Sequence, residues 1–143
     1  MANVRVAWFS PLQPVESGIS IYSEELLPLL GDDLEIDVYV DGYTPTALAG
    51  APNIRIRNYG GGRSGFHRAG YDAIVYQMGN SPAHLYMLDE VTRSPGILVL
   101  HDTVLNHLFV QAAARNGTLR DYRDEGRRFD LIVCNPPYVN EAS

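Results

Sequence analysis

Short apolar runs alternate along this chain with stretches in which apolar positions recur every three or four residues. Apolar runs bounded by turn residues are typical of buried strands, whereas the three-to-four spacing is typical of helices. The pattern predicts strands over residues 3–9, 34–40, 54–57, 73–77, 97–100 and 129–134. It predicts helices over residues 19–30, 82–93 and 103–114.

Strands that alternate with helices indicate an α/β fold: a doubly wound, mainly parallel, Rossmann-like sheet in a single three-layer domain. The chain has 143 residues, which is one domain's worth. We expect the Rossmann-like domain over residues 1–114, a charged linker over 115–128, and a terminal strand with a tail over 129–143. The segment 54–57 alternates between isoleucine and arginine, so we expect it nearer the edge of the sheet.

Polar residues follow three of the predicted strands. Ser17-Gly18 closes the loop after the first strand, Gln77 to Asn80 ends the fourth, and His101-Asp102 ends the fifth. The carboxyl ends of parallel strands form the ligand crevice of such sheets, so we expect these residues at one edge. Backbone N–H groups at the helix start near Gly18 could bind a phosphate, although two residues alone favour a plain turn.

Composition excludes several classes of function. The net charge of −6 argues against nucleic-acid binding. The single cysteine excludes an internal disulfide and a cysteine metal cluster. No signal peptide and no apolar run of about 20 residues is present, so we expect a cytoplasmic protein without a transmembrane segment. All 11 basic residues are arginine, which excludes a Schiff-base or phosphate-loop lysine in this chain.

The four histidines show no convincing metal-ligand spacing, and we expect no metal site. On the residues alone, His101 is a strand-end side chain bonded to backbone. His84 lies beside Tyr86–Leu88, a stripe typical of a core, and is more typical of core or rim than of a ligand contact. We expect His107 at the surface and His67 in a loop.

A larger set of residues carries a family resemblance. These are Phe9-Ser10-Pro11-Leu12, Ser17 to Ser23, Tyr71 to Asn80, His84, Tyr86 to Leu88 and His101-Asp102. In this order and spacing, residues 4 to about 112 resemble the N-terminal, acceptor-side domain of family 4 glycosyltransferases of the two-Rossmann, GT-B type. The resemblance covers about three quarters of the chain.

The resemblance implies transfer of a sugar from a nucleotide-sugar to an acceptor, with retention of configuration and without a metal. His101 and Asp102 are then the catalytic candidates, His101 holding sugar hydroxyls and Asp102 orienting the turn. Ser17 and Gly18 would approach the donor's diphosphate. Gln77, Asn80 and His84 would line the acceptor side.

The family holds its nucleotide in a second Rossmann domain that is not found in this sequence. The resemblance therefore implies a truncated acceptor-side domain that is inactive alone and binds no cofactor by itself. A second Rossmann domain or a partner chain would complete it, because donor and acceptor must be brought into attack geometry. The acceptor is unspecified.

The C-terminal strand carries a different signature. Asn135-Pro136-Pro137-Tyr138 follows the apolar run 129–134 and resembles the target-binding motif of amino-methyltransferases that modify glutamine or adenine N6. That resemblance implies S-adenosylmethionine as cofactor, with the asparagine and a proline carbonyl orienting the target NH₂ group. The glycine-rich run 60–65 formally fits a cofactor loop, but no proper helix follows it, so a flexible loop is favoured.

Three hypotheses remain. The first is the glycosyltransferase-like acceptor domain, which we prefer. The second is an S-adenosylmethionine-dependent amino-methyltransferase fragment, and the third is a non-catalytic α/β binding module.

Overall fold

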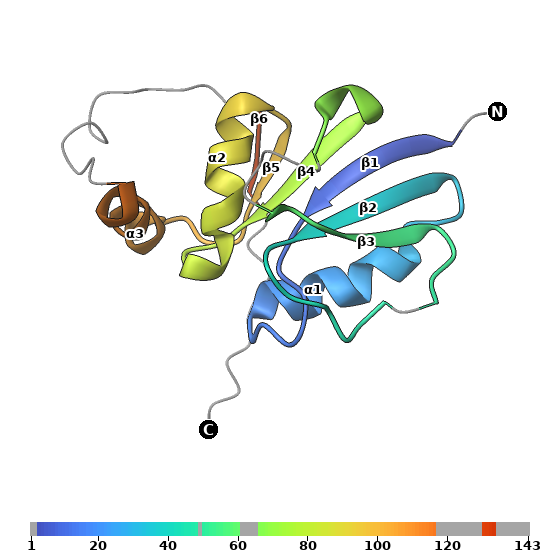
Figure 1. The fold of residues 1–143 in the computed structure, drawn as a ribbon, viewed down its shortest axis with the longest axis horizontal. Coiled ribbons are helices and arrows are strands. Elements are labelled where there is room, and N and C mark those ends of the chain that lie inside the picture. Colours follow the sequence, from blue (N-terminus) through green and yellow to red (C-terminus); the bar gives the residue numbers. More distant parts are fainter. Residues whose placement is uncertain (1–2, 49, 61–65, 117–129, 134–143) are drawn as a thin grey trace.

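The computed structural model describes residues 3–48, 50–60, 66–116 and 130–133. Within these ranges the strands form one six-stranded sheet in the order β3-β2-β1-β4-β5-β6 (Figure 1). Every neighbouring pair of strands is parallel. The strands are β1 (Val4–Phe9), β2 (Leu34–Val40), β3 (Ile54–Asn58), β4 (Ala73–Met78), β5 (Ile97–Leu100) and β6 (Asp130–Val133). The predicted α/β, Rossmann-like fold is confirmed.

The helices are α1 (Gly18–Leu26), α2 (Leu85–Arg93) and α3 (Asn106–Asn116), with single 3₁₀ turns η1 (Leu27–Leu29), η3 (Arg68–Gly70) and η4 (Pro82–His84). The helix predicted over 19–30 leaves α geometry at Leu26. Pro28 lacks an N–H donor and its ring crowds the preceding turn, so the chain tightens into η1. The third helix begins three residues later than expected and continues to Asn116.

The order of the strands reverses between β1 and β4. From β1 the chain extends to β2 and β3 on one side of the sheet, then returns to β4, β5 and β6 on the other. In open α/β sheets the ligand crevice lies at such a switch point, outside the carboxyl ends of the strands. The residues that follow β1 and β4 are therefore candidates for a ligand site.

Each face of the sheet has its own apolar core. One face packs Trp8, Val38 and Ile54 of β1–β3 against Leu27, next to α1. The opposite face packs side chains of β1, β2, β4 and β5 against Met87 and Val91 of α2. Within the described ranges, no helix is long and apolar enough to cross a membrane.

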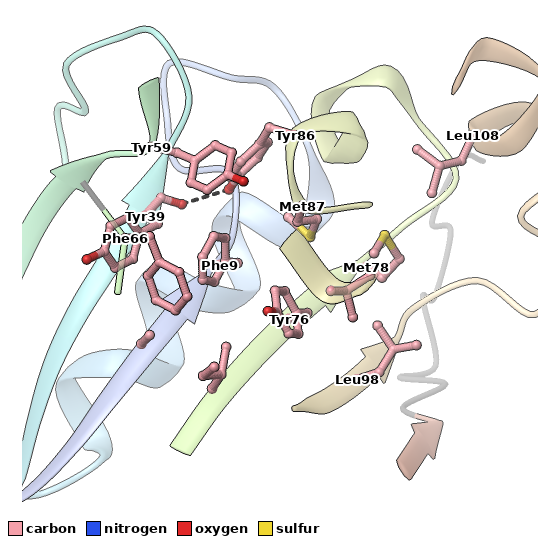
Figure 2. Close-up of a cluster of buried hydrophobic side chains, with 13 residues drawn as sticks. Phe9, Tyr39, Tyr59, Phe66, Tyr76, Met78, Tyr86, Met87, Leu98 and Leu108 are labelled. Carbon is pink, nitrogen blue, oxygen red and sulfur yellow. Dashed lines mark hydrogen bonds between the residues drawn. The ribbon is translucent and has the colours of Figure 1, made fainter. Parts of the chain in front are cut away.

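Phe9, the last residue of β1, lies at the centre of an aromatic cluster (Figure 2). Its ring centroid lies 4.9 Å from that of Tyr76 in β4 and 5.1 Å from those of Tyr39 in β2 and of Phe66. Tyr86 of α2 contacts Phe9 at 6.2 Å and donates a hydrogen bond to the main-chain oxygen of Tyr39. The cluster joins the carboxyl ends of three strands to α2, and it confirms that Tyr86 and Met87 belong to the core.

Asp37 is a buried carboxylate in the middle of β2, with its side chain only 1% exposed. It accepts hydrogen bonds from Arg55 Nε at 2.8 Å and from the Tyr71 hydroxyl at 2.7 Å. Arg5 and Arg57 lie 3.6 Å away in β1 and β3. Burial raises the pKa of Asp37. The hydrogen bonds from Tyr71 and Arg55 and the charges of Arg55 and Arg57 together lower it by more, so the net shift of the pKa is downward.

We predict that Asp37→Asn destabilises the protein by about 2 kcal/mol, because the substitution leaves three arginines without their common buried partner. The matched control is Glu35→Gln on the same strand. Glu35 also pairs with Arg55, but at 3.7 Å and with its side chain 43% exposed, so its loss should cost less than about 0.5 kcal/mol. Urea unfolding of the two variants checks this, and equal losses would contradict it.

Candidate functional site

The polar residues predicted from the sequence follow the carboxyl ends of three adjacent parallel strands. The loop after β1 leads to Ser17 and Gly18, β4 leads to Gly79 and Asn80, and β5 leads to His101 and Asp102. They share the edge of the sheet that includes the switch point between β1 and β4. Hydrogen bonds and ring contacts, described next, link them into one constellation.

His101 is buried at the end of β5, with 7% of the residue exposed. Its main-chain N–H donates to the Met78 oxygen at 2.9 Å and continues the β4–β5 ladder. Its Nε2 lies 2.6 Å from Oε1 of Gln77, and the ring of Tyr22 meets the imidazole edge-on with centroids 4.8 Å apart. Among the described residues, His101 Nδ1 is a buried side-chain atom without a hydrogen-bond partner.

Gln77 and His84 lie inside the protein rather than on a surface. Gln77 is 1% exposed, and so is His84. The Gln77 side chain faces His101, and its main-chain oxygen accepts from His84 Nδ1 at 3.0 Å. Both residues were expected to line the acceptor side. In this structure Gln77 is bonded to His101, and His84 is bonded to the main chain of Gln77.

Gly79 allows close packing at the end of β4. A Cβ atom at this position would clash with the Ile19 Cδ1 atom and would lie 2.9 Å from His84 Nε2. Any other residue here would therefore force the side chains of Ile19 and His84 to shift.

Asp102 and Asn80 tie neighbouring strand ends together. The main-chain N–H of Asn80 donates to Oδ2 of Asp102 at 2.8 Å. Oδ1 of Asn80 accepts from the Leu108 N–H in the first turn of α3 at 3.0 Å. The exposed Asp102 thus holds the β4 turn against the β5 turn.

Ser17 is the N-cap of α1. Its Oγ accepts from the Ile19 N–H at 3.2 Å, and its main-chain oxygen accepts from Ser20 N. The Ile19 N–H group, at the helix start that could bind a phosphate, is therefore already bonded to the cap. The neighbouring Gly18 is exposed at the helix start.

Burial sets the charge state of both histidines. The pKa of His84 is lowered to about 4, mainly by burial and also by the neighbouring His101, against the raising effects of the Gln77 oxygen and of Asp102. Burial also lowers the pKa of His101, against the raising effect of Asp102. Both imidazoles are neutral at pH 7, so the site presents a neutral nitrogen rather than a cation.

A hollow of about 190 Å³ opens at the same edge of the sheet. Its walls come from the loops after β1 and β2, from η4 and the start of α2, and from the end of α3. The lining residues are Val15, Asp41, Tyr43, Pro82, Ala83, Leu85, Tyr86 and Arg115. The hollow combines apolar walls with one carboxylate and one guanidinium.

The described residues contain no group of three or more His, Cys, Asp or Glu side chains that could hold a metal ion. The methyltransferase-like residues Asn135, Pro136, Pro137 and Tyr138 lie outside the described ranges, as do residues 61–65 and 117–129. The strand before the motif is described: β6 pairs with β5, with Val133 opposite Leu100.

Comparisons with known protein families, with curated proteins and with solved structures found no match. The site is therefore interpreted from its own geometry.

Sequence reasoning missed Tyr22 and the charged lining of the hollow. Tyr22 belongs to the run Ser17 to Ser23 that carries the family resemblance, but it was given no role in the site. Its position one turn after Gly18 indicates that it lies near the switch point, and this signal could have identified it. Asp41 and Arg115 are far apart in the sequence and face the hollow only because α3 folds back over η4.

We predict that His84 makes the protein less stable in acid. Its pKa falls from 6.5 to about 4 on folding, so the unfolded state takes up a proton first as the pH drops through this window. The free energy of unfolding should not depend on His84 above about pH 6.5, and it should fall by up to about 3 kcal/mol towards pH 4. Urea unfolding at several pH values measures this loss.

The control variant is His84→Asn, whose amide can still donate to the Gln77 oxygen but does not titrate. Its stability should depend less steeply on pH, whatever its absolute value. An unchanged slope would mean that His84 is not the group responsible.

Proposed function

We propose that this chain is the acceptor-side domain of a retaining glycosyltransferase that takes its sugar from a nucleotide-sugar. The observation that carries the proposal is His101. It follows β5, and β5 pairs with β4, one of the two strands at the switch point. Its buried Nδ1 is left without a hydrogen-bond partner among the described residues. A polar atom in that position calls for a ligand group, because a buried polar atom without a partner costs about 1–3 kcal/mol.

The chemistry of the constellation suits a sugar. A neutral imidazole attracts a hydroxyl group better than it attracts a phosphate, and sugars offer several hydroxyl groups. Tyr22 adds an aromatic edge beside the imidazole. The exposed Gly18 at the start of α1 leaves the positive end of a helix dipole available to a diphosphate.

The nucleotide would be held by a second Rossmann domain or a partner chain, in keeping with the GT-B resemblance. The acceptor would occupy the hollow beside η4, where the apolar wall and the side chains of Asp41, Tyr43 and Arg115 provide contacts. The chain alone should therefore bind ligands weakly and transfer no sugar.

The arrangement of the strands favours this reading over amino-methyl transfer. The glycine-rich run follows β3, at one edge of the sheet, while the Asn-Pro-Pro-Tyr motif follows β6, at the other. Five strand spacings separate β3 from β6, or roughly 24 Å at about 4.8 Å each. The strand ends that precede the two motifs therefore lie at opposite edges of the sheet.

We predict that nucleotide-sugars shift the amide resonances of residues 18, 79–80 and 101–102 of the ¹⁵N-labelled chain, with millimolar affinity. S-adenosylmethionine, titrated in parallel, should shift none of them. His101→Ala should keep the fold and remove most of the sugar-dependent shifts. The matched control is His107→Ala, which changes an exposed histidine in the first turn of α3 and should bind as the original does.

Two outcomes would overturn the proposal. Binding of S-adenosylmethionine that Asn135→Ala abolishes would favour the methyltransferase. Absence of shifts at this edge with every nucleotide-sugar, on a chain whose spectrum shows it folded, would favour a non-catalytic binding module.

A further inference from the structure

Gln77 occupies an unusual position between the two buried histidines of the site. Its side-chain oxygen lies 2.6 Å from His101 Nε2, and its main-chain oxygen lies 3.0 Å from His84 Nδ1. Gln77 is 1% exposed, and both of its oxygens face a histidine nitrogen. An effect of these oxygens on a ligand would therefore pass through the histidines.

The hydrogen bond to Gln77 determines which nitrogen of His101 carries the proton. An amide oxygen only accepts hydrogen bonds, so the His101 Nε2 that faces it must carry the hydrogen. A neutral imidazole has a single N–H, and the second nitrogen, Nδ1, then has a bare lone pair. That nitrogen is the buried atom without a partner.

We propose that Gln77 is a positioning residue: it holds His101 in the Nε2–H tautomer, so that Nδ1 accepts a hydrogen bond from a hydroxyl group of the bound ligand. The inference deepens the proposed function, on which its ligand part rests. The ligand class is a neutral hydroxyl donor such as a sugar. A lone pair repels the unprotonated oxygens of an anion such as sulfate or a carboxylate, so this nitrogen selects against anions that have no O–H group.

His84 provides an internal reference of the opposite tautomer. Its Nδ1 faces a main-chain oxygen, which also only accepts, so Nδ1 must carry the hydrogen. That oxygen belongs to residue 77 whatever its side chain is. A substitution of Gln77 should therefore change the tautomer of His101 and leave that of His84 unchanged.

The experiment is a long-range ¹H–¹⁵N correlation spectrum of the full chain near pH 7, in which protonated and bare ring nitrogens resonate far apart. We expect His101 to show a protonated Nε2 and a bare Nδ1, and His84 the reverse. In Gln77→Met, which keeps the unbranched shape and removes the acceptor, His101 should become a mixture of tautomers. His84 should keep its pattern in the same spectrum, which also verifies the fold.

Two results would overturn the role of Gln77. A protonated Nδ1 on His101 in the original chain would mean that the amide nitrogen of Gln77 faces Nε2. An unmixed Nε2–H tautomer in Gln77→Met, with His84 unchanged, would mean that another group sets it.

The ligand part is tested by adding UDP-glucose or, separately, sulfate, which has no O–H group at this pH. UDP-glucose should move the His101 Nδ1 resonance in the direction expected for accepting a hydrogen bond, and sulfate should leave it in place. If UDP-glucose shifts the backbone amides at this edge but not Nδ1, the hydroxyl contact is wrong while the proposed function stands. If sulfate moves Nδ1 and UDP-glucose does not, selection for hydroxyl donors is wrong.

Discussion

The packing of Phe9 is the interaction on which the rest of this structure depends. Phe9 ends β1, the strand beside the switch point, and its ring contacts Tyr39 of β2, Tyr76 of β4 and Tyr86 of α2. Aromatic pairs of this kind each contribute about 0.5–1.5 kcal/mol beyond the burial of their area. Because protein interiors are close-packed, β1, β2 and β4 cannot slide past one another without breaking these contacts.

The fixed strand ends in turn fix the site. Gln77 follows Tyr76 directly in β4. The hydrogen bond from the His101 N–H to the Met78 oxygen fixes the register of β5 beside β4. The bond between Gln77 and His101 therefore forms on rigid elements, and the bond between Asp102 and Asn80 closes the same turn from the solvent side. Burial of both histidines lowers their pKa values and keeps them neutral. His101 therefore presents an uncharged hydrogen-bonding group at this edge of the sheet.

Most of the sheet could be predicted from the sequence because its strands are short apolar runs between turn residues. The helix ends were less predictable. Pro28 converts the end of the first helix into a 3₁₀ turn, although the apolar spacing continues to Leu30. The common edge of Ser17, Asn80 and His101 could also be predicted, since it follows from parallel strands alone. The burial of Gln77 could not, because it depends on which side chains meet across strands. For His84 the residues alone favoured core or rim, and the structure buries it. The hydrogen bond from the Ile19 N–H to Ser17 agrees with the preference of serine for the N-cap position of a helix.

The account's central claim is that the edge beside β1, β4 and β5 binds a sugar through His101. The most direct measurement is a crystal structure of the chain grown with a nucleotide-sugar at millimolar concentration. The account predicts a sugar hydroxyl oxygen at hydrogen-bond distance, about 2.8 Å, from His101 Nδ1. A nucleotide-sugar bound at another part of the surface, with no ligand atom beside Nδ1, would contradict it.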